Sequence, residues 1–174
     1  MTSCPEKNRA SWRRLGLAGI CAAAMLIGGG AVAQAGQCPA DKAITAANGD
    51  PPHGADTTPQ DVTDTVIGSI DLRQERSVGV NSRLFRLRRL VVQPGGVVPW
   101  HSHGNRPALI YIVEGEITEY ASSCAVPILH RAGETASETH ATAHWWKNTG
   151  RKPVVLLSTD LFPTEDERHD AHMM

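Results

Sequence analysis

Two histidines separated by one residue, His101 and His103, are the side chains of this chain best placed to do chemistry. They lie in a segment, residues 94–116, whose composition favours β-strand. A strand points alternate side chains to the same face, so both imidazoles face the same way. His144, in the later segment AHWWKNTG, offers a third ring nitrogen. Three neutral imidazoles suit one divalent transition metal (iron, manganese, zinc, nickel or copper) and leave positions open for water or substrate.

Neighbours of these histidines are candidates for the same site. His140 precedes the third histidine by four residues. It is either an extra ligand, a hydrogen-bonding partner of a ligand, or a surface histidine. Alternation predicts that Ala108, Ile110 and Ile112 face the interior together as an apolar pocket floor. The same alternation places Trp146 on the inward side, as a pocket wall or as ordinary core.

The elements that must position these residues are short strands. From about residue 62, β-rich runs alternate with turn signals, which is typical of an antiparallel sandwich or barrel. Beyond the N-terminal region, no segment has a convincing helical period. Pro94-Gly95-Gly96, Gly115 and Ala132-Gly133 predict turns. The expected strands cover residues 62–70, 78–80, 84–93, 97–103, 108–114, 116–121, 126–130, 134–138, 143–148 and 153–161.

The N-terminus has the layout of a secretory signal peptide. A basic region precedes an apolar run, and small residues follow that favour cleavage after Ala35. A retained membrane anchor and twin-arginine export through Arg13-Arg14 are the alternatives. We expect a periplasmic or secreted protein. Its parts are a signal peptide (1–35), an irregular arm (36–61), a β-barrel domain (62–162) and a flexible tail (163–174).

Export determines how the four cysteines are used. Cys4 and Cys21 lie in the expected signal peptide, which leaves Cys38 and Cys124 as a pair in an oxidising compartment. We expect a disulfide between these two that ties the arm to the β-domain, with two unrelated thiols as the alternative. In the chain-entropy model, closing a loop of this length contributes on the order of 4 kcal/mol.

The charge pattern argues against a nucleic-acid partner. The 174-residue chain has a formal net charge of −1 and no dominant basic block. One arginine-rich run, residues 83–90, either keeps its arginines on a solvent face or turns one pair into a pocket that attracts an anionic ligand. Alternation groups Arg86 with Arg88 and Arg83 with Arg89, so at most one pair faces inward.

The first histidine segment resembles the first motif of the cupin superfamily. That motif runs Gly, five residues, His-x-His, three or four residues, Glu, six residues, Gly. Gly95 stands at its start, His101 and His103 at the His-x-His positions, and Gly115 at its end. Ala108 stands where the family has glutamate, usually a fourth metal ligand.

The second segment resembles the second cupin motif, which runs Gly, five residues, Pro-x-Gly, two residues, His, three residues, Asn. Here the motif runs from Gly133 through His144 to Asn148, with Thr139 and Ala141 at the Pro and Gly positions. The two motifs lie in the family's order, and the resemblance covers about residues 62–162.

The resemblance implies an all-β fold, a small antiparallel jelly-roll barrel with a metal near its mouth. Ala108 implies a three-histidine site, as in cupins that resemble the thiol and diketone dioxygenases. Without an anionic protein ligand, the metal keeps its full charge and favours anionic substrates.

Two functions follow as hypotheses. The first is an exported, metal-dependent, dioxygenase-like oxidoreductase acting on a small, anionic molecule. The second is a non-catalytic periplasmic protein that binds a small molecule or a metal. No nucleophile motif supports a serine-type or cysteine-type hydrolase. We expect no stable membrane insertion after signal cleavage, and the resemblance leaves a homodimer open.

Overall fold

The structure, a computed structural model, describes residues 36–45, 51–52, 54–140 and 142–164. The expected signal peptide and nearly all of the expected tail lie outside the described residues. Within the described part of the chain, helical structure is limited to three short 3₁₀ turns, and no helix is long and apolar enough to cross a membrane.

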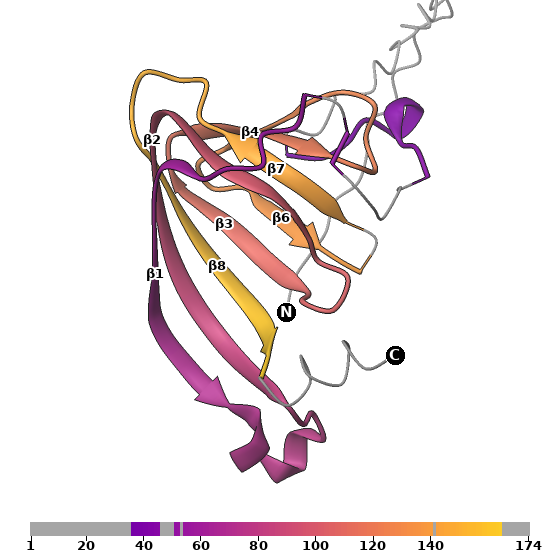
Figure 1. The fold of residues 1–174 in the computed structure, drawn as a ribbon, viewed down its shortest axis with the longest axis vertical. Coiled ribbons are helices and arrows are strands. Elements are labelled where there is room, and N and C mark those ends of the chain that lie inside the picture. The colour runs from indigo at the N-terminus through magenta and orange to yellow at the C-terminus, as the bar shows by residue number, and fades with distance from the viewer. Residues whose placement is uncertain (1–35, 46–50, 53, 141, 165–174) are drawn as a thin grey trace, which may run out of the picture. The chain divides into compact units, whose positions relative to one another are not determined.

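Antiparallel strands form a nearly closed barrel, which confirms the expected all-β jelly-roll fold (Figure 1). The hydrogen-bonded order is β5-β4-β7-β2-β8-β3-β6, and β1 also pairs with β2. The strands are β1 (Gln60–Asp71), β2 (Arg83–Ser102), β3 (Ala108–Glu114), β4 (Glu116–Ala121), β5 (Ile128–Arg131), β6 (Thr135–Glu138), β7 (Ala143–Lys147) and β8 (Val154–Pro163). The 3₁₀ turns are η1 (Ala40–Lys42), η2 (Leu72–Gln74) and η3 (Arg76–Val78).

The strand β2 runs unbroken through Pro94-Gly95-Gly96, so the turn expected there is wrong. Gly95 has a φ of +81°, and its N–H donates to the carbonyl of Asn148. A Cβ on Gly96 would lie 2.8 Å from the carbonyl oxygens of Asp61 and Gln93. The extra residues are therefore absorbed as a bulge that bends the strand. The bend lets β2 pair with β8 along its first half and with β7 along its second.

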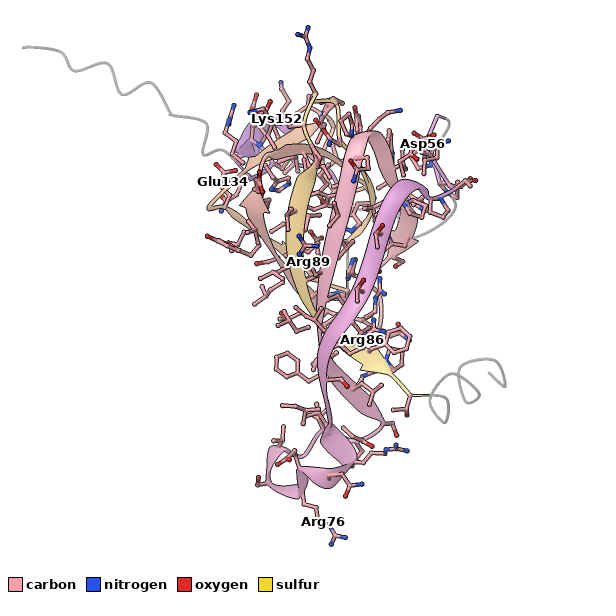
Figure 2. The ribbon with its side chains drawn as sticks, turned by 90° about the vertical axis from the view of Figure 1, so that its left-hand side faces the viewer. Asp56, Arg76, Arg86, Arg89, Glu134 and Lys152 are labelled. Atoms are coloured by element: carbon pink, nitrogen blue, oxygen red, sulfur yellow. A yellow bond between two sulfur atoms is a disulfide. The ribbon has the colours of Figure 1, made fainter. Side chains whose placement is uncertain are left out.

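β1 and the first half of β2 continue below the barrel as a ribbon, and β8 pairs with the other edge of β2 in the same region (Figures 1 and 2). Figure 2 shows Arg86 near the point where the ribbon leaves the barrel and Arg76 at its far end. The strand expected over residues 78–80 is wrong, because Val78 ends η3 and Gly79 turns the chain with a φ of +69°.

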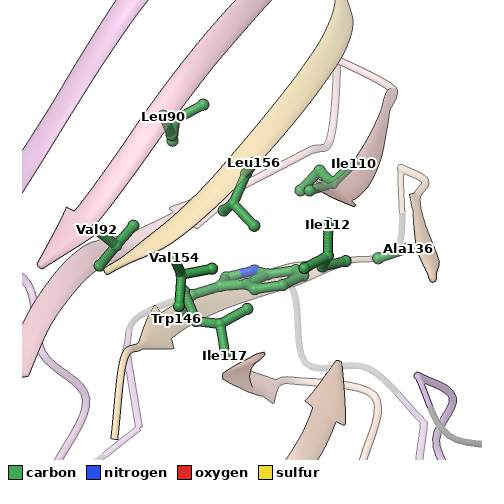
Figure 3. Close-up of a cluster of buried hydrophobic side chains, with 9 residues drawn as sticks. All are labelled: Leu90, Val92, Ile110, Ile112, Ile117, Ala136, Trp146, Val154 and Leu156. Atoms are coloured by element: carbon green, nitrogen blue, oxygen red, sulfur yellow. The ribbon is translucent and has the colours of Figure 1, made fainter. Parts of the chain in front are cut away.

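The hydrophobic core lies inside the barrel, and Trp146 is at its centre (Figure 3). Apolar side chains from five further strands surround the indole. Burying them supplies the main driving force for closing the barrel. The cluster consists of Leu90, Val92, Ile110, Ile112, Ile117, Ala136, Trp146, Val154 and Leu156.

The arm before β1 is fastened to the barrel rather than free along its whole length. Cys38 is bonded to Cys124, the pair that the sequence indicates, with a Cα–Cα distance of 5.8 Å. Ala43 forms a β-bridge with Cys124, and the amide of Gly36 donates to the carbonyl of Leu129. The start of the arm therefore lies against β5 and the loop that precedes it.

Candidate metal centre

Three histidine rings converge at one end of the barrel. His101 on β2 and His144 on β7 are direct cross-strand neighbours, and His103 follows the end of β2. The Nε2 atoms are 3.0 Å apart between His101 and His103, 3.1 Å between His103 and His144, and 3.2 Å between His144 and His101. One ion could contact all three at ordinary metal–nitrogen distances of about 2.0–2.1 Å.

The other nitrogen of each ring determines which tautomer is present. Nδ1 lies 2.7 Å from the carbonyl of Pro99 in His101, 2.7 Å from the carbonyl of Arg106 in His103, and 2.7 Å from Oε1 of Glu119 in His144. Carbonyl and carboxylate oxygens only accept here, so each Nδ1 carries the proton. All three Nε2 lone pairs then face one another, which is unfavourable unless a cation lies between them. The residues present therefore fit a bound divalent metal.

The electrostatics keep two of these rings neutral. Burial, together with repulsion from His144, lowers the pKa of His101 to about 3. The same two causes lower the pKa of His103 to about 4. Because only a neutral imidazole can bind a metal, both rings are ready to ligate at neutral pH.

A buried carboxylate that the sequence analysis missed holds the third ligand in place. Glu119 on β4 accepts hydrogen bonds from Nδ1 of His144 and from Nε2 of His130, each at 2.7 Å. Burial alone would raise the pKa of Glu119, but these two hydrogen bonds outweigh it and lower the pKa. Trp146 Nε1 also approaches Nδ1 of His144, at 3.0 Å. The ionised Glu119 is the stronger partner, so the proton stays on Nδ1 of His144 and is donated to the carboxylate in a hydrogen bond.

A second buried carboxylate, Glu138 on β6, lies beside the same pair. Its Oε2 is 3.4 Å from Nδ1 of His144. Burial and the charge of Glu119 raise the pKa of Glu138 well above its ordinary value. Glu138 is also the cross-strand neighbour of Ala108, the position where the family motif has glutamate. The acid nevertheless contacts the outer nitrogen of His144, so it does not replace that missing ligand.

A cluster of ion pairs is built around one buried acid of β8. Asp160 on β8 is fully buried and accepts from Arg86 through two hydrogen bonds of 2.9 and 2.6 Å. Arg88 is 3.4 Å from Asp160 and is also paired with Asp64 of β1. Arg89 is exposed. Arg86 and Arg88 are therefore the pair turned inward, and both contact Asp160, which also has Arg106 at 3.8 Å. That this pair attracts an anionic ligand stays a prediction.

A pocket of about 350 Å³ lies beside His101. Eight of its twelve lining residues are apolar, and Ile110 and Trp146 are among them, as alternation predicts. Ala108 and Ile112 are not, so the expected pocket floor is only partly correct. Ile112 packs under Trp146 in the core, while Ala108 pairs with Glu138 and Asp160.

The fourth candidate histidine lies away from the cluster. His140 is exposed in the turn after β6 and belongs to neither group of described residues that could hold a metal. One group is the three histidines, and the other is Glu119, Glu138 and His144. His130 is 1% exposed and stacks on Trp146 with ring centroids 4.6 Å apart. Its Nδ1 has no hydrogen-bond partner in the described structure.

Comparison with known proteins gives one matching domain family and several curated relatives. The cupin domain family matches residues 88–160. A germin-like protein (subfamily 2 member 2) of Arabidopsis thaliana is 29% identical over 87 residues, which cover 48% of this chain and 40% of that protein. Nectarin-1 of Nicotiana plumbaginifolia is 26% identical over 87 residues, or 48% of this chain and 38% of that protein. The chain therefore aligns with about two-fifths of the length of these curated relatives.

Solved structures with a similar fold include a predicted oxalate decarboxylase of Thermotoga maritima. It is 16% identical, with a TM-score of 0.47, and the match covers 63% of this chain and 94% of that one. An oxalate oxidase in complex with the substrate analogue glycolate is 19% identical, with a TM-score of 0.46, and the match covers 60% of this chain and 53% of that one. The barrel, the two histidine motifs within it and the matching domain lead to one conclusion: residues 88–160 of this chain form a domain of the cupin superfamily.

Proposed function

We propose that this chain is an exported, metal-dependent oxidoreductase of the dioxygenase type that acts on a small, anionic molecule. One observation carries the proposal: three Nε2 lone pairs face one another within 3.0–3.2 Å while every Nδ1 proton is held by an acceptor. A divalent transition metal bound there would supply Lewis acidity and a meeting point for a substrate and oxygen. The basic, apolar N-terminal sequence and the Cys38–Cys124 disulfide support export.

The chain's own residues would perform three tasks in this activity. His101, His103 and His144 would hold the ion, and Glu119 would fix the third ring in the tautomer that leaves Nε2 free. The apolar pocket wall beside His101 would orient the substrate and exclude water from the reacting atoms.

A non-catalytic binding protein is the second candidate, and one observation favours it. Among the described residues that line the pocket, Asp64 is the one carboxylate, and it is paired with Arg88. The pocket therefore offers no unpaired carboxylate to act as a general base.

Elemental analysis and oxygen uptake test the proposal together. Protein purified from the native compartment should contain one transition metal per chain, and this metal should be lost in His101→Ala, His103→Ala and His144→Ala variants. The matched control His140→Ala should keep it, because His140 is exposed and outside the cluster. Metal-dependent oxygen consumption with phenols, thiols or diketones would support the enzyme. Stoichiometric metal with ligand binding but no turnover would favour the binding protein.

A further inference from the structure

We propose that the metal-side pocket selects a substrate with an apolar body about the size of a ring and a single anionic, metal-binding head. It should discriminate against compact diacids such as oxalate. The inference rests on the proposed function, because it concerns the ligand of the same three-histidine site. Three features of the pocket support it: its lining, its size and its charge.

The lining is apolar except at the metal ligand His101, at the ion pair of Asp64 with Arg88, and at Ser158. Leu90, Ile110, Trp146 and Leu156 form a continuous buried surface from β2, β3, β7 and β8. Val62 of β1 packs against this surface and also lines the pocket. The surface therefore favours a ligand that removes apolar area from water.

The size matches a ring with a small polar head. The pocket measures about 350 Å³. An engineered cavity of about 150 Å³ with a Leu, Ile and Phe lining binds benzene in another protein, so this pocket has room for one ring and a chelating group. A ligand with only two carbons would leave most of the apolar wall in contact with water.

The charge of the pocket leaves no partner for a second carboxylate. Arg88 is the one arginine or lysine among the described lining residues. Its Nε donates to Asp64 at 3.1 Å, and its Nη1 lies 3.4 Å from Asp160. Asp160 is shared with Arg86 and, at 3.8 Å, with Arg106, and neither of these arginines lines the pocket. The one guanidinium group on the pocket wall therefore already contacts two carboxylates. A second carboxylate of a ligand would lose its hydration in the pocket without meeting an unpaired cation on the wall, which is costly.

Because β1 supplies part of the wall, it offers a way to alter selectivity without replacing a metal ligand or a fully buried core residue. Val62 faces the pocket and is half-buried. Thr63, the next residue on β1, is exposed, and strand alternation points it to the other face. A tryptophan at position 62 should fill the pocket, and one at 63 should not.

The test is calorimetric titration of the zinc-loaded full chain, since zinc is redox-inert and binding is then measured without turnover. Benzohydroxamate and acetohydroxamate carry the same zinc-binding head and differ in the apolar body. We expect benzohydroxamate to bind at least tenfold more tightly than acetohydroxamate or oxalate. Val62→Trp should abolish that preference, and Thr63→Trp should retain it.

The outcomes separate this inference from the proposed function. Equal or tighter binding of acetohydroxamate or oxalate by the wild-type protein, loaded with one zinc per chain, overturns the pocket inference alone. This comparison of ligands needs no variant, so it stands even where Val62→Trp does not fold. Failure of the wild-type chain to bind zinc overturns the proposed function and this inference with it.

Discussion

Replacing Glu119 with glutamine should weaken metal binding while leaving the barrel folded. The carboxylate is 4% exposed, and each of its oxygens accepts one histidine N–H. Glutamine keeps one acceptor oxygen but loses the charge, so the bond to Nδ1 of His144 becomes an ordinary neutral hydrogen bond. The preference for the tautomer that leaves Nε2 free to bind a metal weakens accordingly.

The expected loss of zinc affinity follows from the hydrogen bond between residue 119 and His144, which changes from charged to neutral. Hydrogen bonds to charged groups contribute about 1.5–3 kcal/mol, and neutral ones about 0.5–1.5 kcal/mol. The difference of about 1–2 kcal/mol corresponds to a roughly 5- to 30-fold loss of affinity. On the other side of the amide, His130 can adapt, because its Nδ1 has no partner in the described structure. The ring can move its proton to Nδ1 and accept from the new NH₂ group, which protects the fold.

The assay is zinc titration against a chromophoric chelator, with a thermal melt of the metal-free variant to verify folding. Glu116→Gln is the matched control, since Glu116 lies on the same strand with its side chain 56% exposed. The control should bind zinc like the wild type. A folded Glu119→Gln variant with an affinity within twofold of the wild type would refute the assigned role of Glu119.

Three further predictions concern protons and the disulfide. Because the pKa values of His101 and His103 are about 3 and about 4, protons should not compete with zinc at these rings above about pH 4. Zinc affinity measured by competition should then fall by no more than about tenfold per pH unit from pH 7 to 5, the slope of a single competing proton, and a steeper fall would contradict this. The raised pKa of Glu138 means that the folded state holds a proton that the unfolded chain releases above its ordinary value of 4.5. The stability contributed by that proton is fully present below pH 4.5 and falls as the pH rises toward the folded pKa of about 9. The Tm advantage of metal-free Glu138→Gln over wild type should therefore grow from pH 5 to 8. A constant difference in Tm would count against it. Finally, a Cys38→Ser, Cys124→Ser double variant should lose about 4 kcal/mol of unfolding free energy in urea, given the loop that the disulfide closes. An unchanged urea midpoint would show that the bond does not constrain the unfolded chain.

Local alternation was sufficient to predict which faces of single strands meet. It placed His101 and His103 on one face and grouped Arg86 with Arg88, and the structure has both arrangements. These predictions depend on two-residue periodicity within one strand, and no knowledge of strand partners is needed. The spacing of the second motif added His144, whose neighbour in the barrel is fixed by the pairing of β2 with β7.

The acids behind His144 could not be predicted so directly, because their role depends on which strands pair. In sequence, Glu119 and Glu138 look like the solvated charges that usually alternate with apolar residues in strands. A usable signal was present: Glu119 has the same parity as Ile117, and Glu138 has the same parity as Ala136, and both apolar residues are buried. Parity therefore indicates inward carboxylates, but only the pairing of β4 with β5 and β7 shows that a histidine lies on each side of Glu119.

The position of these acids changes how the missing glutamate at residue 108 should be understood. Ala108 removes a carboxylate from the ligand set, which by itself would leave the ion with its full charge. Glu119, however, accepts a hydrogen bond from Nδ1 of His144 and stays ionised, so it would make that imidazole a more electron-rich ligand. Glu119 would thus pass part of its negative charge to the metal through the imidazole of His144, without being a metal ligand itself. A metal bound by the three histidines would then keep a coordination position open for substrate while part of its charge is compensated. Both features together require Glu119 to remain buried and ionised.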